Sequence, residues 1–173
     1  MTVRRATSSD SAAIAKVHVD TWRSTYHGIV SEEVLEDLSY DDRHRMWENT
    51  LTEHAADNHL YVVEDENGEV VGFVATGMAR EAGTSTLGEI YAIYLLKEHQ
   101  GKGMGKLLFL KAAERLSKEG YESMMLWVLA DNPTRGFYEA MGGILGDAKD
   151  IDIGGDMLHE VAYRWEKLES LAG

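Results

Sequence analysis

The residues best suited to chemistry form a glycine-rich run, QGKGMG, directly before a helical stretch. Gly101, Gly103 and Gly105 lack a Cβ, so the backbone can turn tightly and bring several N–H groups close to one anion. Lysine side chains within and after the run add positive charge. The run therefore predicts a phosphate-binding loop at a helix N-terminus. It comprises Gln100, Gly101, Lys102, Gly103, Met104, Gly105 and Lys106.

The elements around this loop place it between a buried strand and a helix. Residues 89–96 are apolar apart from Glu89 and the tyrosine hydroxyls, which predicts a central strand. Residues 106–117 form the following helix, and a second apolar strand is expected at 124–129. The strands are about thirty residues apart, the size of a right-handed crossover, so they should run parallel. The predicted buried face of the helix consists of Leu107, Leu110, Ala113 and Leu116.

Shorter elements flank this unit on both sides. A strand at 3–6 and three helices are expected before residue 55, and 60–64 with 70–78 predict an antiparallel hairpin across the turn ENGE. Asp131 and Asn132 should cap a helix that runs to Met141. Two last strands are expected, near residue 144 and at 158–165, joined by an acidic loop over 147–156.

These elements predict one α/β (α+β) domain over residues 1–173, with a mixed sheet of about six or seven strands flanked by helices. A length of 173 residues with 44% hydrophobic content is enough for one full core.

Composition excludes several kinds of site. The chain has no cysteine, which excludes disulfides and thiol nucleophiles, and its seven histidines lack HxxxH or HExxH spacing, so we expect no metal. It has neither a basic-apolar leader nor an apolar stretch of membrane-spanning length. We therefore expect a soluble cytoplasmic protein with no membrane partner.

The net charge of −13 is unevenly distributed. Residues 31–69 carry thirteen Asp and Glu, whereas residues 97–118 carry six Lys and Arg around the glycine loop. The basic region suits a compact ligand with several phosphates, and the overall negative charge disfavours nucleic acid. The acidic region is either a solvated surface or a means of attracting cationic substrates.

The order of these blocks resembles the GNAT superfamily of N-acetyltransferases. The family's Q/RxxGxG/A pyrophosphate loop matches residues 100–105, and its Nxx(A/R)xxFYExxGF helix matches NPTRGFYEAMGG at 132–143. The resemblance covers residues 3–165. Two positions depart from the pattern: Lys97 stands where many members have Pro, and Gly143 where most have an aromatic residue. Gly143 begins a strand, where it bears more on packing or on contacts in a homodimer than on chemistry.

The resemblance implies that the sheet is splayed at its central parallel pair and that acetyl-coenzyme A (acetyl-CoA) is the donor. It implies that the loop N–H groups hold the pyrophosphate, and that Lys102 or Lys106 meets the 3'-phosphate. It further implies that the strand around Ile93 to Leu95 pairs with the pantetheine arm through backbone groups. The amine would attack the thioester directly in a ternary complex, without an acyl-enzyme.

Tyr138 and Asn132 lie in the second matching block. A phenol can protonate a leaving thiolate, and Tyr138 has the position of the family's tyrosine, so Tyr138 is the predicted general acid. Its ring could instead complete an apolar helix face with Phe137. The resemblance places Asn132 against the cofactor arm, and a plain helix N-cap is the alternative or additional role.

On the acceptor side, Glu89 begins the central strand, near the point where the amine must lose a proton. A carboxylate desolvated by aromatic neighbours could act as the general base, directly or through a water, or it could be a surface carboxylate. Trp22, Tyr26 and Tyr91 are predicted to line the acceptor site. For Trp22 and Tyr26, one helical turn apart, a place in the core is the alternative.

Together these residues favour an enzyme that transfers an acetyl group from acetyl-CoA to a primary amine. The acceptor is left open between a small cationic amine and a protein N-terminus or lysine. A non-catalytic module that binds acyl-CoA as a sensor or scaffold is the alternative. A P-loop nucleotide hydrolase is a third interpretation, which the lack of GxxxxGK[ST] and of a Walker B type acidic strand disfavours.

Overall fold

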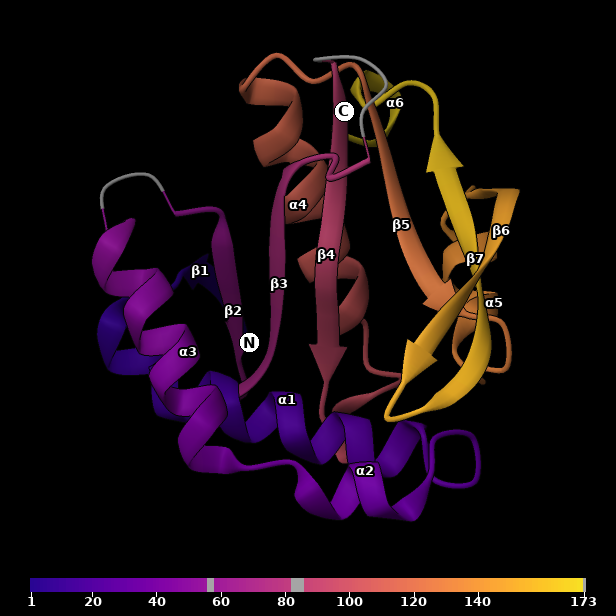
Figure 1. Cartoon of the computed structure of the whole chain (residues 1–173). Helices are drawn as coiled ribbons and strands as arrows, with labels where there is room; N and C mark the ends of the chain where they lie inside the picture. Colours follow the sequence, from indigo (N-terminus) through magenta and orange to yellow (C-terminus); the bar gives the residue numbers. More distant parts are fainter. Residues whose placement is uncertain (56–57, 82–85, 173) are drawn as a thin grey trace.

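A twisted seven-stranded sheet forms the centre of the molecule (Figure 1). The computed structural model describes residues 1–55, 58–81 and 86–172. The strand order is β1-β2-β3-β4-β5-β7-β6, and every neighbouring pair is antiparallel except β4 and β5. The mixed sheet predicted from the sequence is confirmed. The strands are β1 (Thr2–Arg5), β2 (Leu60–Glu64), β3 (Val70–Met78), β4 (Leu87–Leu95), β5 (Ser123–Leu129), β6 (Ile144–Ile153) and β7 (Asp156–Trp165).

Helices cover both faces of the sheet. The helices are α1 (Ser11–Thr25), α2 (Glu32–Asp37), α3 (Tyr40–Glu53), α4 (Met104–Lys118), α5 (Arg135–Ala140) and α6 (Glu169–Ala172), with 3-10 turns at Ser8–Asp10 and Lys97–His99. Helices α1 and α3 pack on β2 and β3 from one side, and α4 and α5 pack on the other. Among the described residues, no helix combines the length and apolarity that a membrane crossing requires.

Strands β4 and β5 part soon after they meet. Their parallel ladder has three pairs and ends where Glu89 lies opposite Met125. Beyond it β4 continues beside β3 alone, and β5 continues beside β7. A bulge at Tyr91, which has no partner between Ala75 and Thr76, bends β4 at this point. The predicted splay is thereby confirmed, and it opens the sheet between two buried strands.

The C-terminal region corrects one prediction. Residues 147–156 form most of strand β6 and the turn to β7, whereas an acidic loop was expected there. The turn at Gly154 and Gly155 has positive φ at both residues, as a two-residue hairpin requires. Ile151 and Ile153 are half-buried between acidic residues that point to solvent. This period-two alternation is that of a strand, and the high acidity concealed it.

Helix α4 begins two residues earlier than expected, and its inward face agrees with the prediction in part: Ala113 and Leu116 are buried, and Leu110 is partly buried. Leu107 is 39% exposed, although it was predicted to be buried. The glycine run itself supplies Met104 as the first buried residue, which sets the register of the inward stripe. That stripe consists of Met104, Leu108, Phe109, Ala112, Ala113 and Leu116.

Close packing against Trp165 explains why residue 143 is a glycine. A Cβ at this position would lie 2.7 Å from Cζ2 of Trp165 and 2.9 Å from the carbonyl oxygen of Tyr138. Trp165 is buried, and its indole N–H donates to the carbonyl of Met141 at 3.0 Å, which fixes the ring. The Trp165 ring thus fills space next to residue 143, so an aromatic side chain there has no room.

We therefore expect Gly143→Ala to lower the free energy of unfolding by about 1–3 kcal/mol, the usual cost of overpacking. Gly146→Ala is the matched control, because its Cβ would meet only the Ala162 carbonyl oxygen, at 3.8 Å. Urea denaturation of both variants measures the difference. Equal unfolding midpoints for the two variants would contradict this account of the packing.

Candidate active site

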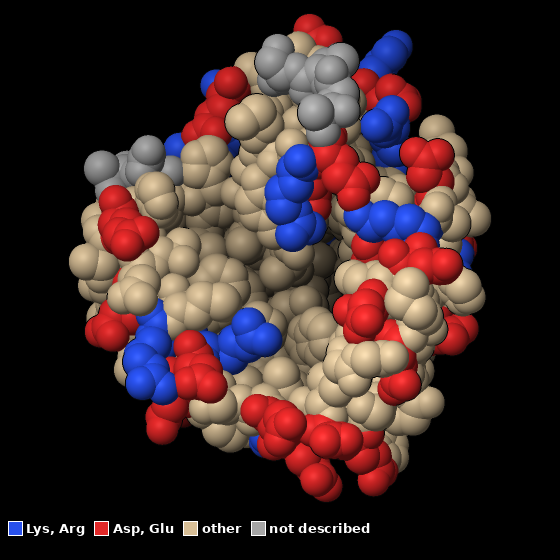
Figure 2. Space-filling view, in the orientation of Figure 1, with Lys and Arg blue, Asp and Glu red and all other residues tan. Residues whose placement is uncertain are grey.

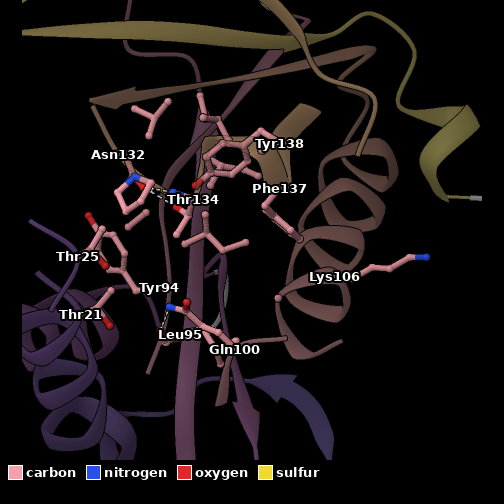
Figure 3. A pocket seen from close by; sticks show the side chains of 18 of the residues that line it. Thr21, Thr25, Tyr94, Leu95, Gln100, Lys106, Asn132, Thr134, Phe137 and Tyr138 are labelled. Atoms are coloured by element: carbon pink, nitrogen blue, oxygen red, sulfur yellow. Dashed lines mark hydrogen bonds between the residues drawn. The ribbon is translucent and has the colours of Figure 1, made fainter. Parts of the chain in front are cut away.

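A cavity of about 580 Å³ lies where β4 and β5 part (Figure 3). Its walls are the residues of β4 from Ile90 to Leu95 and those of β5 from Leu126 to Val128. The glycine loop and the start of α4 close one end, and the segment after β5 with helix α5 closes the other. Because β4 has no strand partner on this side, its edge faces the cavity.

The loop before α4 has the geometry of an anion cradle. Gly101 and Gly103 have φ values of +75° and +85°, and a Cβ at either would meet no atom within 4 Å. Gly103 is the N-cap of α4, with no side-chain capping bond, and Leu107 N donates to its carbonyl at 3.2 Å. The N–H groups of residues 104–106 precede that first bond, so they are available to an anion.

The predicted cofactor residues of this loop differ in burial and in whether they line the cavity. Gln100 Nε2 donates to the Leu95 carbonyl at 3.0 Å and so ties the loop to the end of β4. Lys106 lines the cavity, and Figure 3 shows its ammonium pointing away from the cavity centre. Lys102 is exposed and is not part of the lining. Met104 is buried in the core, which leaves only its backbone for a ligand.

The basic region has less unpaired positive charge than its sequence suggests. Lys111 and Lys118 both pair with Glu114, and Arg115 pairs with Glu119, so two carboxylates on the surface of α4 offset most of the charge of these three cations. In the part of the chain that the structure describes, Lys102 and Lys106 have no such ion pair. The free positive charge is therefore concentrated next to the glycine loop.

Tyr138 and Asn132 lie at the α5 end of the cavity. The Tyr138 side chain is buried, its ring lies against Phe137 and Tyr163, and burial raises the pKa of its hydroxyl above the usual range. Asn132 accepts from the backbone N–H of Thr134 at 2.8 Å, and its Nδ2 donates to the Tyr26 hydroxyl at 3.2 Å. Asn132 thus links the segment after β5 to helix α1, besides holding the turn before α5.

A second cavity of about 460 Å³ adjoins the first. Trp22, Tyr26 and Tyr91, the predicted acceptor residues, all line it. Trp22 and Tyr26 contact edge to face, with ring centroids 4.8 Å apart, and the Trp22 indole donates to the Tyr94 hydroxyl at 3.1 Å. Aromatic residues form the wall that both cavities share: Tyr26, Tyr91, Tyr94 and Trp127.

Glu89 lies on the second cavity, at the last pair of the parallel ladder. Its side chain is 1% exposed, so it is not a surface carboxylate. Arg80, two residues beyond the end of β3, donates to both of its oxygens: the backbone N–H to Oε1 at 3.0 Å, and the guanidinium to Oε2 at 2.6 and 3.1 Å. The buried negative charge is thereby balanced by one arginine.

Sequence reasoning missed several residues of these walls, among them Arg80, Tyr94, Trp127, Lys149 and Glu160. Two of them, Trp127 and Glu160, lie in strands whose sequence pattern carries a usable signal. Trp127 interrupts the apolar strand β5 with a polar-tipped ring, and Glu160 occupies an inward position of β7 between His159 and Val161. A carboxylate at an inward strand position is costly without a partner, so its position predicts a site. Arg80 and Lys149 carry no comparable signal.

No group of three or more His, Asp and Glu side chains that could hold a metal ion occurs within residues 1–55, 58–81 and 86–172.

Comparisons with known proteins agree with this arrangement. A model of the acetyltransferase (GNAT) family matches residues 17–143. An uncharacterized N-acetyltransferase of Bacillus subtilis, YuaI, is 39% identical over 171 residues, covering 99% of this chain and 96% of that protein.

Two solved structures have the same fold. The PaiA N-acetyltransferase of Thermoplasma acidophilum, in complex with coenzyme A, has a TM-score of 0.73 at 23% identity and covers 92% of this chain and 96% of its own. YncA of Salmonella typhimurium, with acetyl-CoA, has a TM-score of 0.72 at 20% identity, and the match covers 96% of this chain and 93% of YncA.

An open mixed sheet that parts beside a glycine loop is the architecture of acyl-CoA-dependent N-acyltransferases. The chain belongs to the acetyltransferase (GNAT) family, whose members transfer an acetyl group from acetyl-CoA to an amine. The resemblance found in the sequence is confirmed.

His18 supports the aromatic wall from behind. It is buried in α1, its ring lies 5.3 Å from that of Tyr94, and Trp47 Nε1 donates to its Nδ1 at 3.2 Å. Burial, with a smaller contribution from the charge of Arg43, lowers the pKa of His18 to about 4.

This shift predicts a pH dependence of stability. Between pH 6.5 and 4 the unfolded chain binds a proton at His18 that the folded chain does not, so stability falls as pH falls through this window. The total loss is about 3 kcal/mol. His18→Gln, which keeps an acceptor for Trp47, should flatten the unfolding free energy over this range. Parallel pH profiles for wild type and variant would contradict the assignment.

Proposed function

We propose that acetyl-CoA binds across the first cavity and that the acceptor amine enters the second, so that the two react at the shared aromatic wall. The observation that carries this proposal is the parting of β4 and β5 beside a loop with free N–H groups. The adjoining second cavity gives an amine an approach that does not compete with the cofactor.

The residues of the first cavity fit a coenzyme A thioester. The N–H groups from Gly101 to Lys106 suit its pyrophosphate, and Lys106, with Lys102 nearby, supplies charge for a further phosphate. The edge of β4 from Ile93 to Leu95 offers backbone groups to an amide-containing arm. When bound, acetyl-CoA supplies the acetyl group as a reactive thioester.

Tyr138 is the proposed general acid. A phenol is protonated at neutral pH even at its ordinary pKa, and burial raises the pKa of Tyr138 further, so its hydroxyl has a proton to donate to a sulfur that becomes negative as the thioester breaks. Among the described residues no hydrogen bond engages this hydroxyl, and Tyr138 lines the first cavity. Asn132, held by Thr134 and Tyr26, orients the segment from which α5 starts.

Glu89 remains the proposed general base, with a condition that the sequence did not reveal. Arg80 donates three hydrogen bonds to its carboxylate, which leaves little acceptor capacity for the amine or a water, and movement of Arg80 would free more of it. The Arg80 side chain is 64% exposed, which leaves it room to move.

The acceptor is a primary amine in this proposal, small enough for the second cavity. A protein N-terminus or lysine stays compatible with it. The cytoplasmic location and the homodimer remain predictions of the sequence.

Tyr138→Phe tests the acid role. We expect kcat to fall about a hundredfold, within the range for loss of a general acid, while the KM for acetyl-CoA changes little. Release of free thiol with a panel of polyamines, amino acids and peptides gives the rate. Tyr121→Phe, outside both cavities, is the control.

An unchanged kcat for Tyr138→Phe would remove Tyr138 as the acid. If the wild-type chain binds acetyl-CoA tightly but releases no thiol with any amine, the sensor or scaffold alternative replaces the transferase.

A further inference from the structure

Glu160 is a buried carboxylate on the acceptor cavity that neither the fold nor the proposed reaction uses. It lies in β7 opposite Leu129 of β5 and Lys149 of β6, and the residue is 9% exposed. Its negative charge contributes to the raised pKa of the Tyr26 hydroxyl, after the larger effect of burial, so it lies within electrostatic reach of the wall shared by the two cavities.

A primary ammonium already occupies the space beside Glu160. Lys149 Nζ lies 3.4 Å from Glu160 Oε1 and 4.1 Å from the centroid of the Trp127 ring, and it also contacts Glu81. A carboxylate and an indole face together form a good site for an alkylammonium ion. Trp127 belongs to both cavities, so this ammonium lies close to where the acceptor nitrogen must reach the donor.

The charges around the cavity favour a cation over an anion. Its lining includes three carboxylates, Glu81, Glu89 and Glu160, against the cations Arg80 and Lys149. Arg80 is engaged by Glu89, so Lys149 alone balances the other two. Since the Lys149 side chain is about one-third exposed, it can swing outward, and Glu160 then faces the cavity without a cation.

The acidic surface continues beside the cavity. Helix α2 carries Glu32, Glu33, Glu36 and Asp37, and it packs with Val34 against Gly154 at the tip of the β6–β7 hairpin. Figure 2 shows this face hollowed near its centre, with acidic side chains along the lower edge and Lys and Arg side chains at the rim. A second positive charge on the acceptor would therefore also be stabilised.

We propose that the acceptor is a cationic amine whose ammonium binds between the carboxylate of Glu160 and the ring of Trp127, in the place that Lys149 occupies in the free chain. The inference rests on the proposed function of the second cavity. Glu160 and Trp127 then recognise the amine, and Lys149 competes with it. An acceptor that carries a carboxylate would instead bind to Lys149. Removal of that lysine would then weaken binding of the acceptor, whereas it should strengthen binding of a cationic amine.

Two probes of similar length separate these cases: 1,4-diaminobutane, with a second ammonium, and 4-aminobutanoate, with a carboxylate. Binding is followed through the indole N–H signal of Trp127 in NMR spectra, with acetyl-CoA replaced by coenzyme A so that nothing turns over. The chain has four Trp residues, so the signals can be assigned with Trp→Phe variants.

For 1,4-diaminobutane we expect Glu160→Gln to weaken binding about tenfold and Lys149→Met to strengthen it about tenfold. Methionine keeps the apolar stem of the lysine but removes the competing charge. Glu114→Gln and Lys118→Met, an ion pair on α4 remote from both cavities, are the matched controls and should leave binding unchanged.

Weaker binding of 1,4-diaminobutane to Lys149→Met would overturn the proposal, as would tighter binding of 4-aminobutanoate to the wild-type chain than of the diamine. Absence of any shift of the Trp127 signal up to about 50 mM diamine, a concentration that detects even weak ligands, would overturn it as well. Thiol release with other amines is measured on the same variants. If release persists while these binding results fail, the acceptor inference is wrong and the proposed function stands.

Discussion

The parting of β4 from β5 after three residue pairs is the constraint on which the site depends. Two central strands of a sheet normally satisfy one another's backbone groups along their whole length. Here β4 leaves that partner at Glu89, and the bulge at Tyr91 bends it away, so one edge of a buried strand faces a cavity instead of a neighbour. The backbone N–H and C=O groups along this free edge are regularly spaced, which suits an extended ligand that contains amide groups.

The other parts of the fold hold this opening in shape. On one side the glycine loop leads directly into α4 at the end of the opening, and Gln100 fixes this loop to the last residue of β4. On the other side Asn132 and Tyr26 connect the segment after β5 to α1. The β6–β7 hairpin and α2 close the acceptor side, where apolar contacts join them. Each wall of the site thus comes from an element that is anchored elsewhere in the core.

Local patterns in the sequence were sufficient for the framework. The hairpin of β2 and β3, the crossover through α4 and the glycine loop follow from turn residues, apolar runs and spacing, and the structure confirms them. The strand expected near residue 144 is β6, but its extension over residues 147–153 was missed because its inward residues, Ile151 and Ile153, alternate with aspartates that face solvent. The inward face of α4 was predicted correctly at Ala113 and Leu116 but wrongly at Leu107, because the helix begins inside the glycine run, at Met104.

The charges of the site could not be read from the sequence, because their partners come from distant strands. Glu89 looked like a free base, yet Arg80, beyond the end of β3, holds both of its oxygens. Glu160 and Lys149 meet only through the register of β6 and β7. Glu160 and Trp127 of β5 are brought together by the ammonium of Lys149, which contacts both. Such pairs depend on tertiary register, which no local pattern encodes.

Hydrogen–deuterium exchange with and without saturating acetyl-CoA tests most directly whether the parted strands hold the donor. Exchange should slow at the backbone amides of residues 91–95 in β4 and of residues 101–106 in the loop and first turn of α4, because a bound donor takes the place of a strand and of an anion. Exchange in β1 and β2, on the far edge of the sheet, should stay unchanged. Saturable binding of acetyl-CoA that leaves both segments exchanging as fast as before would contradict the account.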